Sequence, residues 1–477
     1  TSPNFCESEE SPRPVVIVLA GPTAVGKSSV ALELCRRTEE EDGRTARILS
    51  ADSVQAYAGP SIGANKPSAR ERERFRHDLL DLYDAAAEEE KDKVRTAADW
   101  YDVAVACLEE CVTEKSVPVV AGGTMMYVNW LIYGRPDVGL PSDAAVKRAE
   151  EIMGKNREEE EGEGWEKAVQ AAAAYGTVFR ERAENIEQGD WYRLQRTMET
   201  ALTDAERRKD DKGAGETTPE IYTGKKRGGL DELGYDARCF FLCPDDRRTH
   251  ASVVDERCEQ MIMRGLIQET ADLRTTDRLP DKGVVAKAIG YRQTLDYLLR
   301  PDPRPRDANV LSLFVDRHMA ATRRYSQQQL KWYRKDGGFL FVPVPVAAAV
   351  GGKERIASVA DMVQRWAEAS REEYEGELRN RVAPADVAAV VGGGGAGGGT
   401  RKRQKRAAAE EKVVALLEKM NMSQRTRTVN ELQGSDMKTF ASKRTVLSVG
   451  SDAFETVLEV ADRCTAQLQE LGEDWGH

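Results

Sequence analysis

The segment GPTAVGKSS, residues 21–29, has the residue types and spacing of a loop that binds polyphosphate. Its glycines allow backbone N–H groups to point at phosphate oxygens, and it lies between an apolar run and a helical pattern. Lys27 would add a positive charge, and the Ser28 hydroxyl would be a ligand for Mg²⁺. The spacing therefore predicts polyphosphate binding and leaves the reaction open.

Asp52 and Thr124 are two other polar residues that directly follow apolar stretches. A carboxylate beside a phosphate site can hold a metal or accept a proton from a nucleophile, whereas an isolated Asp is often only a helix N-cap. Ser53, Gln55 and Lys66 lie close to Asp52 in the sequence, which favours a functional role. A motor or switch enzyme is disfavoured, because the stretch before Thr124 ends without an acid and no complete guanine-binding motif is present.

An open parallel sheet would bring these polar segments together. The apolar runs 15–20, 46–51 and 115–124 predict buried strands, and residues 27–38 predict a helix between the first two. Ligands of such sheets bind at the carboxyl ends of the strands, where all three polar segments lie. We therefore expect an α/β fold, a P-loop-type doubly wound parallel sheet with a helical insertion domain.

Changes in composition divide the chain into five parts. We expect a disordered N-terminal segment (1–14), an α/β catalytic core (15–140 and 236–345), a helical insertion with a flexible loop (141–235), an extension with a glycine-rich linker (346–400), and a tail with a basic cluster and helices but no assigned role (401–477). Within these parts we expect a strand at 237–244, a polar loop at 206–229, and helices near 247–275, 284–299, 307–335, 407–420 and 453–471.

The composition of the 477 residues is that of a globular chain with no membrane span, since 32% of the residues are charged. The net charge of −11 does not indicate nucleic-acid binding, but it is compatible with a local basic face. Eight cysteines and four histidines lack the spacing of a zinc site, so we expect free thiols. We expect a cytoplasmic monomer, with mitochondrion, plastid and nucleus as alternative compartments.

Six segments, in this order, resemble the tRNA dimethylallyltransferase (tRNA isopentenyltransferase) family. They are GPTAVGKSSVA, SADSVQAYAGPSIGANKPS, VPVVAGGTMMYVNWLIYG, DWYRLQRTMET, AIGYRQTLDYL and ATRRYSQQQLKWYR, within residues 15–345. The resemblance implies that the loop holds the diphosphate of dimethylallyl diphosphate, with Mg²⁺, and that the prenyl group passes to N6 of an adenosine in the anticodon stem-loop of tRNA. Diphosphate would then be a leaving group rather than a reactant in phosphoryl transfer.

The resemblance also implies roles for individual residues. Asp52 matches the general base, Thr23 a contact to the leaving oxygen, Thr124 a position near the reacting groups, and Arg292 a further basic group that assists the reaction. The matched diphosphate-binding residues are Gly21, Thr23, Ala24, Val25, Gly26, Lys27, Ser28 and Lys287. The matched tRNA-contacting residues are Asp52, Ser53, Val54, Gln55, Lys147, Tyr192, Arg193, Leu194, Gln195, Arg196 and Arg323.

The chain departs from the family pattern at several positions. Gln327 and Gln328 replace a basic pair, which would weaken contacts to tRNA phosphates. Residues 63–67 read GANKP where many bacterial members read GTAKP, and Asp78 replaces a common His. The small number of histidines argues against the C-terminal zinc finger of some eukaryotic members.

Three alternative functions share the phosphate loop. An adenylate isopentenyltransferase, which makes a free cytokinin, would use the same loop and base but would not need a helical RNA clamp. A small-molecule kinase needs only the loop, an acid and a lid. A nucleotide-binding interaction protein would not need Lys27, Ser28, Asp52 and Thr124 together.

Overall fold

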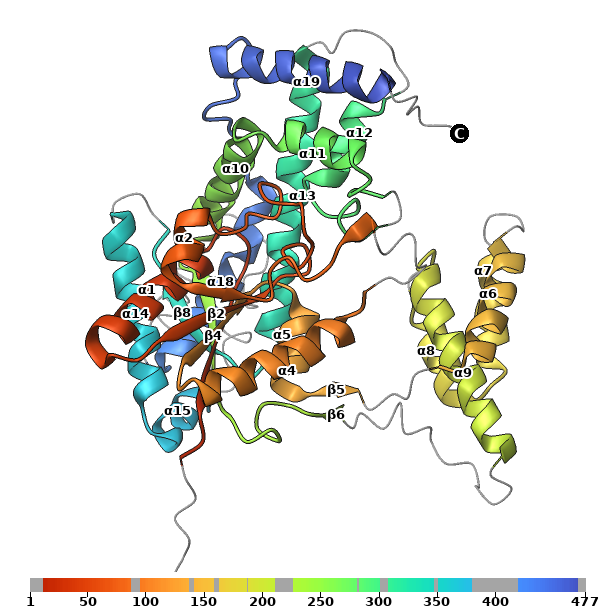
Figure 1. Cartoon of the computed structure of the whole chain (residues 1–477), viewed down its shortest axis with the longest axis horizontal. Helices are drawn as coiled ribbons and strands as arrows, with labels where there is room; N and C mark the ends of the chain where they lie inside the picture. The colour runs from red at the N-terminus through yellow and green to blue at the C-terminus, as the bar shows by residue number, and fades with distance from the viewer. Residues whose placement is uncertain are drawn as a thin grey trace, which may run out of the picture. The chain divides into compact units, whose positions relative to one another are not determined.

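The computed structural model describes residues 12–86, 95–136, 141–157, 163–186, 188–210, 226–280, 283–300, 308–346, 351–379 and 419–470. The chain forms two compact units (Figure 1). One unit consists of Thr1–Ile132 with Leu230–His477, and the other is Tyr133–Gly229. The sequence places the insertion at 141–235. The predicted glycine-rich linker, the basic cluster and the helix at 407–420 lie outside the described residues, apart from the last two residues of that helix.

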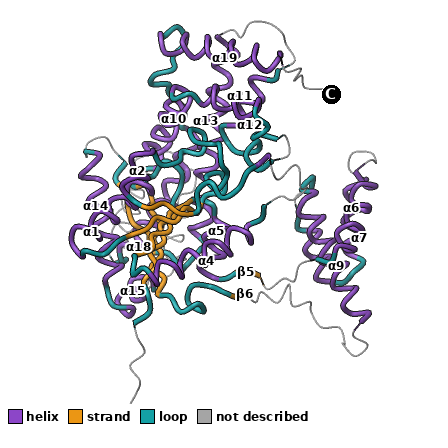
Figure 2. The backbone as a smooth tube through the Cα atoms, viewed as in Figure 1, coloured by secondary structure: helices purple, strands orange, loops and turns teal. Residues whose placement is uncertain are grey.

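Parallel strands form the central sheet of the first unit (Figure 2). There are six of them, in the order β3-β2-β4-β1-β7-β8. They are β1 (Val15–Ala20), β2 (Ala46–Ala51), β3 (Arg76–Asp78), β4 (Val117–Gly122), β7 (Asp236–Pro244) and β8 (Leu340–Val344). The four strands predicted from the sequence are β1, β2, β4 and β7. Because all six strands run in the same direction, the loops after β1, β2 and β4 meet at one edge of the sheet.

Helices cover both faces of this sheet, as expected for a doubly wound fold. Side chains alternate along β1, so Leu19 packs with α1 and α14 while Val18 packs with α4 and α5. On the second face, Trp100 stacks on Tyr127 with ring centroids 4.3 Å apart. These helices and their short neighbours are α1 (Lys27–Asp42), α2 (Ala69–Arg74), α4 (Ala97–Thr113), α5 (Met125–Tyr133), α14 (Gly352–Glu368) and α15 (Arg371–Leu378).

A second apolar core of the first unit lies among five helices. They are α10 (Arg247–Met263), α11 (Leu266–Thr275), α12 (Tyr291–Leu298), α13 (Ala308–Arg334) and α19 (Asp452–Glu470). The single helix predicted over 247–275 is wrong, because Gly265 adopts a φ of +107° between α10 and α11. The helix predicted over 284–299 is shorter than expected, since residues 284–290 form turns.

The C-terminal segment covers the outer strand of the sheet. α18 (Met422–Leu432) packs along β8, and the Phe341 N–H donates to Ser423 Oγ at 2.8 Å. The following 3₁₀ helix η2 (Gln433–Thr439) contacts α10. An edge strand normally leaves a row of unpaired backbone groups, so α18 protects this edge. The tail, which has no assigned role in the sequence analysis, thus completes the core of this unit.

The second unit is a helical bundle with a small antiparallel ribbon. Its elements are β5 (Arg135–Pro136), α6 (Asp143–Arg157), α7 (Glu163–Ala173), α8 (Thr177–Glu184), α9 (Trp191–Asp210) and β6 (Lys226–Arg227). Its core includes Trp165, Leu194 and Met198. The polar loop predicted over 206–229 is partly wrong, since α9 continues to Asp210. Across the described residues of both units, no helix has the length and apolar character needed to cross a bilayer.

Candidate active site

A cavity of about 400 Å³ opens where the loops after β1, β2 and β4 meet. It is lined by residues from these loops and from two helices, α10 and α13. The lining residues are Thr23, Ala24, Gly26, Lys27, Ser28, Ser29, Asp52, Gln55, Ala64, Asn65, Ala121, Gly122, Gly123, Val253, Glu256, Arg257, Gln260, Tyr325 and Gln329. The phosphate loop and Asp52, which the sequence predicts to be neighbours, therefore share one cavity.

The phosphate loop has a backbone that only small residues permit. A Cβ at Gly21 would lie 2.8 Å from the carbonyl oxygen of Leu242, so this position requires glycine. Ala24 and Gly26 adopt φ angles of +64° and +103°, which direct the chain into α1. Val25 is buried beneath the loop, so it supports the loop and does not line the cavity.

Lys27 is enclosed by the loop. Its Nζ donates to the carbonyl oxygens of Gly21 at 2.9 Å and Pro22 at 3.0 Å. Burial and, to a smaller extent, the positive charge of Arg257 lower the pKa of Lys27 to about 7, and the Asp52 carboxylate acts in the opposite direction. Two basic side chains, Lys27 and Arg257, therefore line the cavity together with two acidic ones, Asp52 and Glu256, and an anion bound beside Lys27 would favour its charged form.

The lowered pKa of Lys27 predicts that diphosphate binding takes up protons. Above pH 7 the free ammonium loses its proton, whereas a bound diphosphate favours the charged form. At pH 8 we expect uptake of about one proton per site, and we expect the affinity to fall by up to about tenfold per pH unit above 7. Calorimetric titration with inorganic diphosphate, in buffers of different ionisation enthalpy, would measure this uptake. Equal apparent enthalpies in all buffers at pH 8 would contradict the prediction.

Asp52 directly follows β2, and its carboxylate is held by the backbone. Oδ1 accepts the N–H groups of Val54 at 2.9 Å and Gln55 at 3.3 Å. Among the described residues, Oδ2 has no hydrogen-bond partner. The Ser53 N–H donates to Thr124 Oγ1 at 3.0 Å, which joins the loop after β2 to the loop after β4. One oxygen of Asp52 thus orients the side chain and the other remains for chemistry.

Gln329, which the sequence did not identify, links two walls of the cavity. The Thr23 N–H donates to its Oε1 at 2.9 Å, and its Nε2 donates to the Gly123 carbonyl at 3.0 Å. Gln329 is only 1% exposed, and the neighbouring Leu330 and Tyr333 are buried on the same side of α13. A polar residue on the apolar face of a predicted helix is the signal that could have found it.

Arg257 is the second cavity residue that sequence reasoning missed. It lies on α10, where burial lowers its pKa, and the Asp52 charge opposes this effect. No ion-pair partner is present for it among the residues that the structure describes.

Tyr325 also lines the cavity, and its hydroxyl donates to the Gly123 carbonyl at 3.3 Å. The aromatic residues within 322–334 therefore have different roles, because Tyr325 lines the cavity and Tyr333 is buried in the core.

Several predicted site residues do not line the cavity. Lys287 and Arg292 are exposed, Arg292 on α12 and Lys287 in the turn before it. Lys66 is buried and forms an ion pair with Asp81 at 2.5 Å. These three residues belong to the same unit as Asp52, but none of them lines the cavity.

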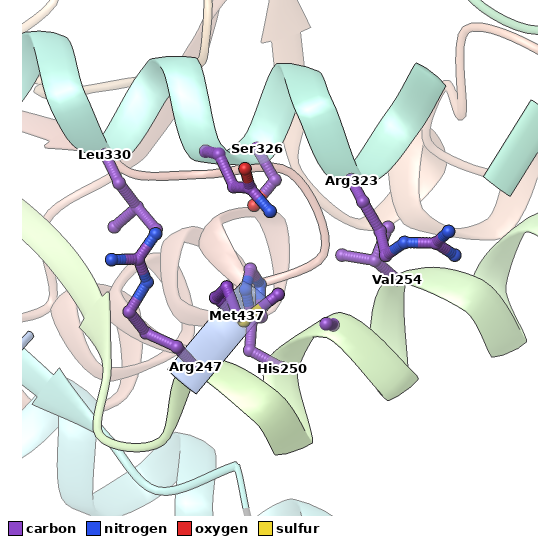
Figure 3. A pocket seen from close by; sticks show the side chains of 9 residues that line it. Arg247, His250, Val254, Arg323, Ser326, Leu330 and Met437 are labelled. Carbon is purple, nitrogen blue, oxygen red and sulfur yellow. The ribbon is translucent and has the colours of Figure 1, made fainter. Parts of the chain in front are cut away.

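Arg323, a predicted tRNA contact, has internal partners instead. It forms an ion pair with the buried Asp255, and its Nη1 donates to Ser442 Oγ at 3.2 Å. Figure 3 shows Arg323 on α13 beside Val254 of α10, whereas Met437 of η2 lies beside His250 in the same pocket. The contacts to Asp255 and Ser442 engage its guanidinium within the protein, and the contact of Arg323 to tRNA stays a prediction.

The predicted tRNA-contacting residues of the second unit lie on its helices. On α9, Tyr192, Arg193 and Arg196 are exposed, with Tyr192 at 70%. Lys147 on α6 is exposed as well. Leu194 is fully buried, because its position on α9 faces the core of the bundle. The side chain of Gln195 donates to Glu199 at 3.1 Å, and the two exposed arginines pair with acids three residues away, Arg193 with Asp190 at 3.3 Å and Arg196 with Glu199.

The cavity also contains oxygen atoms that could bind Mg²⁺. No group of three His, Cys, Asp or Glu side chains suited to a metal occurs in the described parts of the chain. Ser28, Asp52 and Glu256 nevertheless supply oxygen atoms within one cavity. Mg²⁺ usually keeps several waters and is bound by one or two carboxylates together with substrate phosphates, so this oxygen set fits the ion.

Similarity to known proteins extends over most of the chain. Residues 55–336 match the family described as IPP transferase. The tRNA dimethylallyltransferase of Anaeromyxobacter sp. is 33% identical over 70% of this chain and 96% of its own length. That of Alkalilimnicola ehrlichii is 31% identical over 72% and 95%, and tRNA dimethylallyltransferase 9 of Arabidopsis thaliana is 29% identical over 69% and 72%.

A solved structure of a eukaryotic dimethylallyltransferase acting on tRNA supports the fold. It aligns with a TM-score of 0.53 and 20% identity, over 74% of this chain and 80% of the solved one. The matched family segment includes Gln55, Gly123 and Gln329, and the cavity that these residues line also contains the phosphate loop. The chain belongs to the IPP transferase family.

Proposed function

We propose that this chain transfers a dimethylallyl group from dimethylallyl diphosphate to N6 of an adenosine adjacent to the anticodon in tRNA. The observation that carries the proposal is the arrangement of one cavity, in which a cationic phosphate loop faces a carboxylate with a free oxygen. The relatives named tRNA dimethylallyltransferase support the same reaction. The bond that breaks joins the prenyl C1 to the diphosphate oxygen, and the bond that forms joins C1 to N6.

The phosphate loop would stabilise the leaving group. Negative charge grows on the diphosphate as the C1–O bond breaks, and fixed donors in a partly enclosed site stabilise this charge strongly. Lys27 and Arg257 supply two positive charges, and the backbone N–H groups of the loop supply further donors. Thr23, whose own N–H is held by Gln329, would contact the leaving oxygen.

Asp52 would act as the general base. The exocyclic amine of adenine is a poor nucleophile, because its lone pair is delocalised into the ring. Removal of one N6 proton during bond formation restores nucleophilicity, and a fixed carboxylate oxygen can accept that proton. Oδ2 of Asp52 is suited to this task because the backbone contacts engage Oδ1.

We also propose that Mg²⁺ accompanies the diphosphate. Ser28 and Glu256 would hold the ion together with substrate oxygens and water. When bound, Mg²⁺ would supply further positive charge to the leaving diphosphate. The residues described above would still orient the substrates, and Asp52 would still accept the proton.

The helical unit would bind the anticodon stem of tRNA. The acceptor base must leave the RNA stack to reach Asp52, at a cost of a few kcal/mol that is smallest in an unpaired loop. The exposed arginines of α9 would hold the stem meanwhile through phosphate contacts. We propose that a single chain suffices, since all predicted catalytic groups come from one chain.

The double variant Arg193→Ala, Arg196→Ala is expected to raise the KM for tRNA about tenfold or more at physiological salt, because two phosphate contacts are lost. The KM for dimethylallyl diphosphate should remain unchanged. Steady-state kinetics with each substrate varied in turn would test this. Arg148→Ala offers a matched control, since Arg148 is an exposed arginine of α6 that pairs with Glu151 three residues away, as Arg193 and Arg196 pair with Asp190 and Glu199. A change confined to the diphosphate KM would contradict the assignment.

Transfer of label distinguishes the candidate functions. Labelled dimethylallyl diphosphate is offered with either a tRNA or AMP as acceptor, and we expect label in the tRNA alone. Label in AMP alone would identify an adenylate isopentenyltransferase instead. Hydrolysis of ATP without any label transfer would contradict both prenyltransferase functions and favour a kinase.

A further inference from the structure

The turn over residues 61–66 forms part of the cavity wall beside Asp52. Ala64 and Asn65 from this turn line the cavity together with Gln55. Asn65 has a φ of +48°, in the left-handed region that few residues with a side chain adopt. A residue held in this conformation at a binding site raises the question of whether its side chain or only its backbone is needed.

Glu269 and Tyr291 hold this turn in place. The Glu269 carboxylate accepts three successive backbone N–H groups, from Ser61 at 3.0 Å, Ile62 at 2.7 Å and Gly63 at 2.9 Å. The Tyr291 hydroxyl donates to the same carboxylate at 2.6 Å. A Cβ at Gly63 would lie 2.4 Å from the Tyr291 ring, so the turn packs directly on it. The position of Asn65 is therefore fixed by several contacts from α11 and α12.

Two side-chain amides, of Gln55 and Asn65, lie at this wall, and that of Asn65 remains available to hydrogen-bond a ligand. Gln55 uses Nε2 to donate to the carbonyls of Ala64 at 3.1 Å and Asn65 at 3.2 Å, and its Oε1 accepts from Ser50 Oγ at 2.7 Å. Both N–H donors of Gln55 are thus engaged within the protein. The Asn65 amide has no hydrogen-bond partner within the described part of the chain, although it is only partly exposed.

We propose that Asn65 is a specificity-determining residue that hydrogen-bonds the acceptor adenine, an inference that rests on the proposed function. An amide presents a donor and an acceptor side by side, which matches the N6–H and the adjacent ring nitrogen of adenine. During transfer, Asp52 takes one N6 proton, C1 bonds to N6, and diphosphate leaves with the C1–O electron pair. The Asn65 carbonyl holds the second N6–H, which stays on the product and orients the attacking nitrogen.

Two substitutions separate this role from a purely conformational one. Asn is among the residues that tolerate a left-handed conformation, so the turn alone could explain its presence. Asn65→Gly removes the amide but keeps the left-handed backbone accessible, whereas Asn65→Ala removes the amide and strains the turn. The wild-type chain, assayed in parallel with labelled dimethylallyl diphosphate and tRNA, shows separately whether the proposed function holds.

If Asn65 contacts the adenine, Asn65→Gly lowers kcat/KM for tRNA about tenfold or more, with unchanged affinity for dimethylallyl diphosphate and an unchanged Tm. The alanine variant then shows at least the same loss. Wild-type activity in Asn65→Gly, with a loss only in Asn65→Ala, would overturn the proposal, because it assigns Asn65 to the turn alone. A loss in both variants accompanied by weaker diphosphate binding would overturn it as well. Absence of transfer by the wild-type chain would refute the proposed function instead.

Discussion

Replacement of Asp52 by Asn is expected to reduce dimethylallyl transfer to tRNA by about 10²- to 10⁴-fold. The amide keeps an oxygen that can accept the N–H groups of Val54 and Gln55, so the turn after β2 should remain intact. The variant loses only the ability to take a proton from N6. Single-turnover measurement of labelled product in tRNA gives the rate of the chemical step.

Binding of dimethylallyl diphosphate provides the control for Asp52→Asn. The phosphate loop is untouched, so the dissociation constant should stay within about threefold of the wild-type value. Calorimetry at pH 6.5, where Lys27 is largely protonated, measures this dissociation constant. Full transfer activity in the variant would remove Asp52 as the base. Loss of diphosphate binding would instead indicate a metal-binding role.

Replacement of Lys27 by Met should lower the rate of transfer by about 10²- to 10³-fold, because a charge that stabilises the leaving diphosphate disappears. Lys27 is enclosed among the loop carbonyls, so water cannot fully replace its ammonium group. The affinity for dimethylallyl diphosphate should fall as well, and the proton uptake predicted at pH 8 should be lost. Single-turnover rates and calorimetry measure the two effects.

Lys353→Met is the matched control for this variant. Lys353 is an exposed lysine on α14 that does not line the cavity, so its removal changes the net charge equally without touching the loop. We expect unchanged transfer and unchanged proton uptake for it. If Lys27→Met kept the proton uptake at pH 8, another group would have to be responsible for it.

The parts of the fold that were predictable from the sequence are those with strong local signals. β1, β2 and β4 are short apolar runs bounded by turn residues, and all three lie at the expected positions. β3 is too short to show any pattern, with three polar residues from Arg76 to Asp78. The break at Gly265 depends on how α10 and α11 pack, which periodicity cannot reveal.

The candidate site also contains residues that were predictable from the sequence and residues that were not. The phosphate loop, Asp52 and Thr124 could be found because they follow strands, and parallel strands bring their carboxyl ends together. Arg257 and Gln329 come from helices that reach the cavity only through tertiary packing, so their sequence neighbourhood gives a weak signal. Arg323 is a surface cation by sequence, and its partner Ser442 lies far along the chain in a tail with no assigned role.

The position of α18 and α19 has a consequence for biosynthesis. α18 covers β8, and Phe454 of α19 completes the core beneath α11, yet both helices lie in the last part of the chain. Domains generally fold as units during synthesis, from the N-terminus onward. The sheet edge and the helical core must therefore stay incomplete until residues 422–470 leave the ribosome. A nascent chain at that stage presents an open strand edge, whose unpaired backbone groups can pair with other chains and promote aggregation.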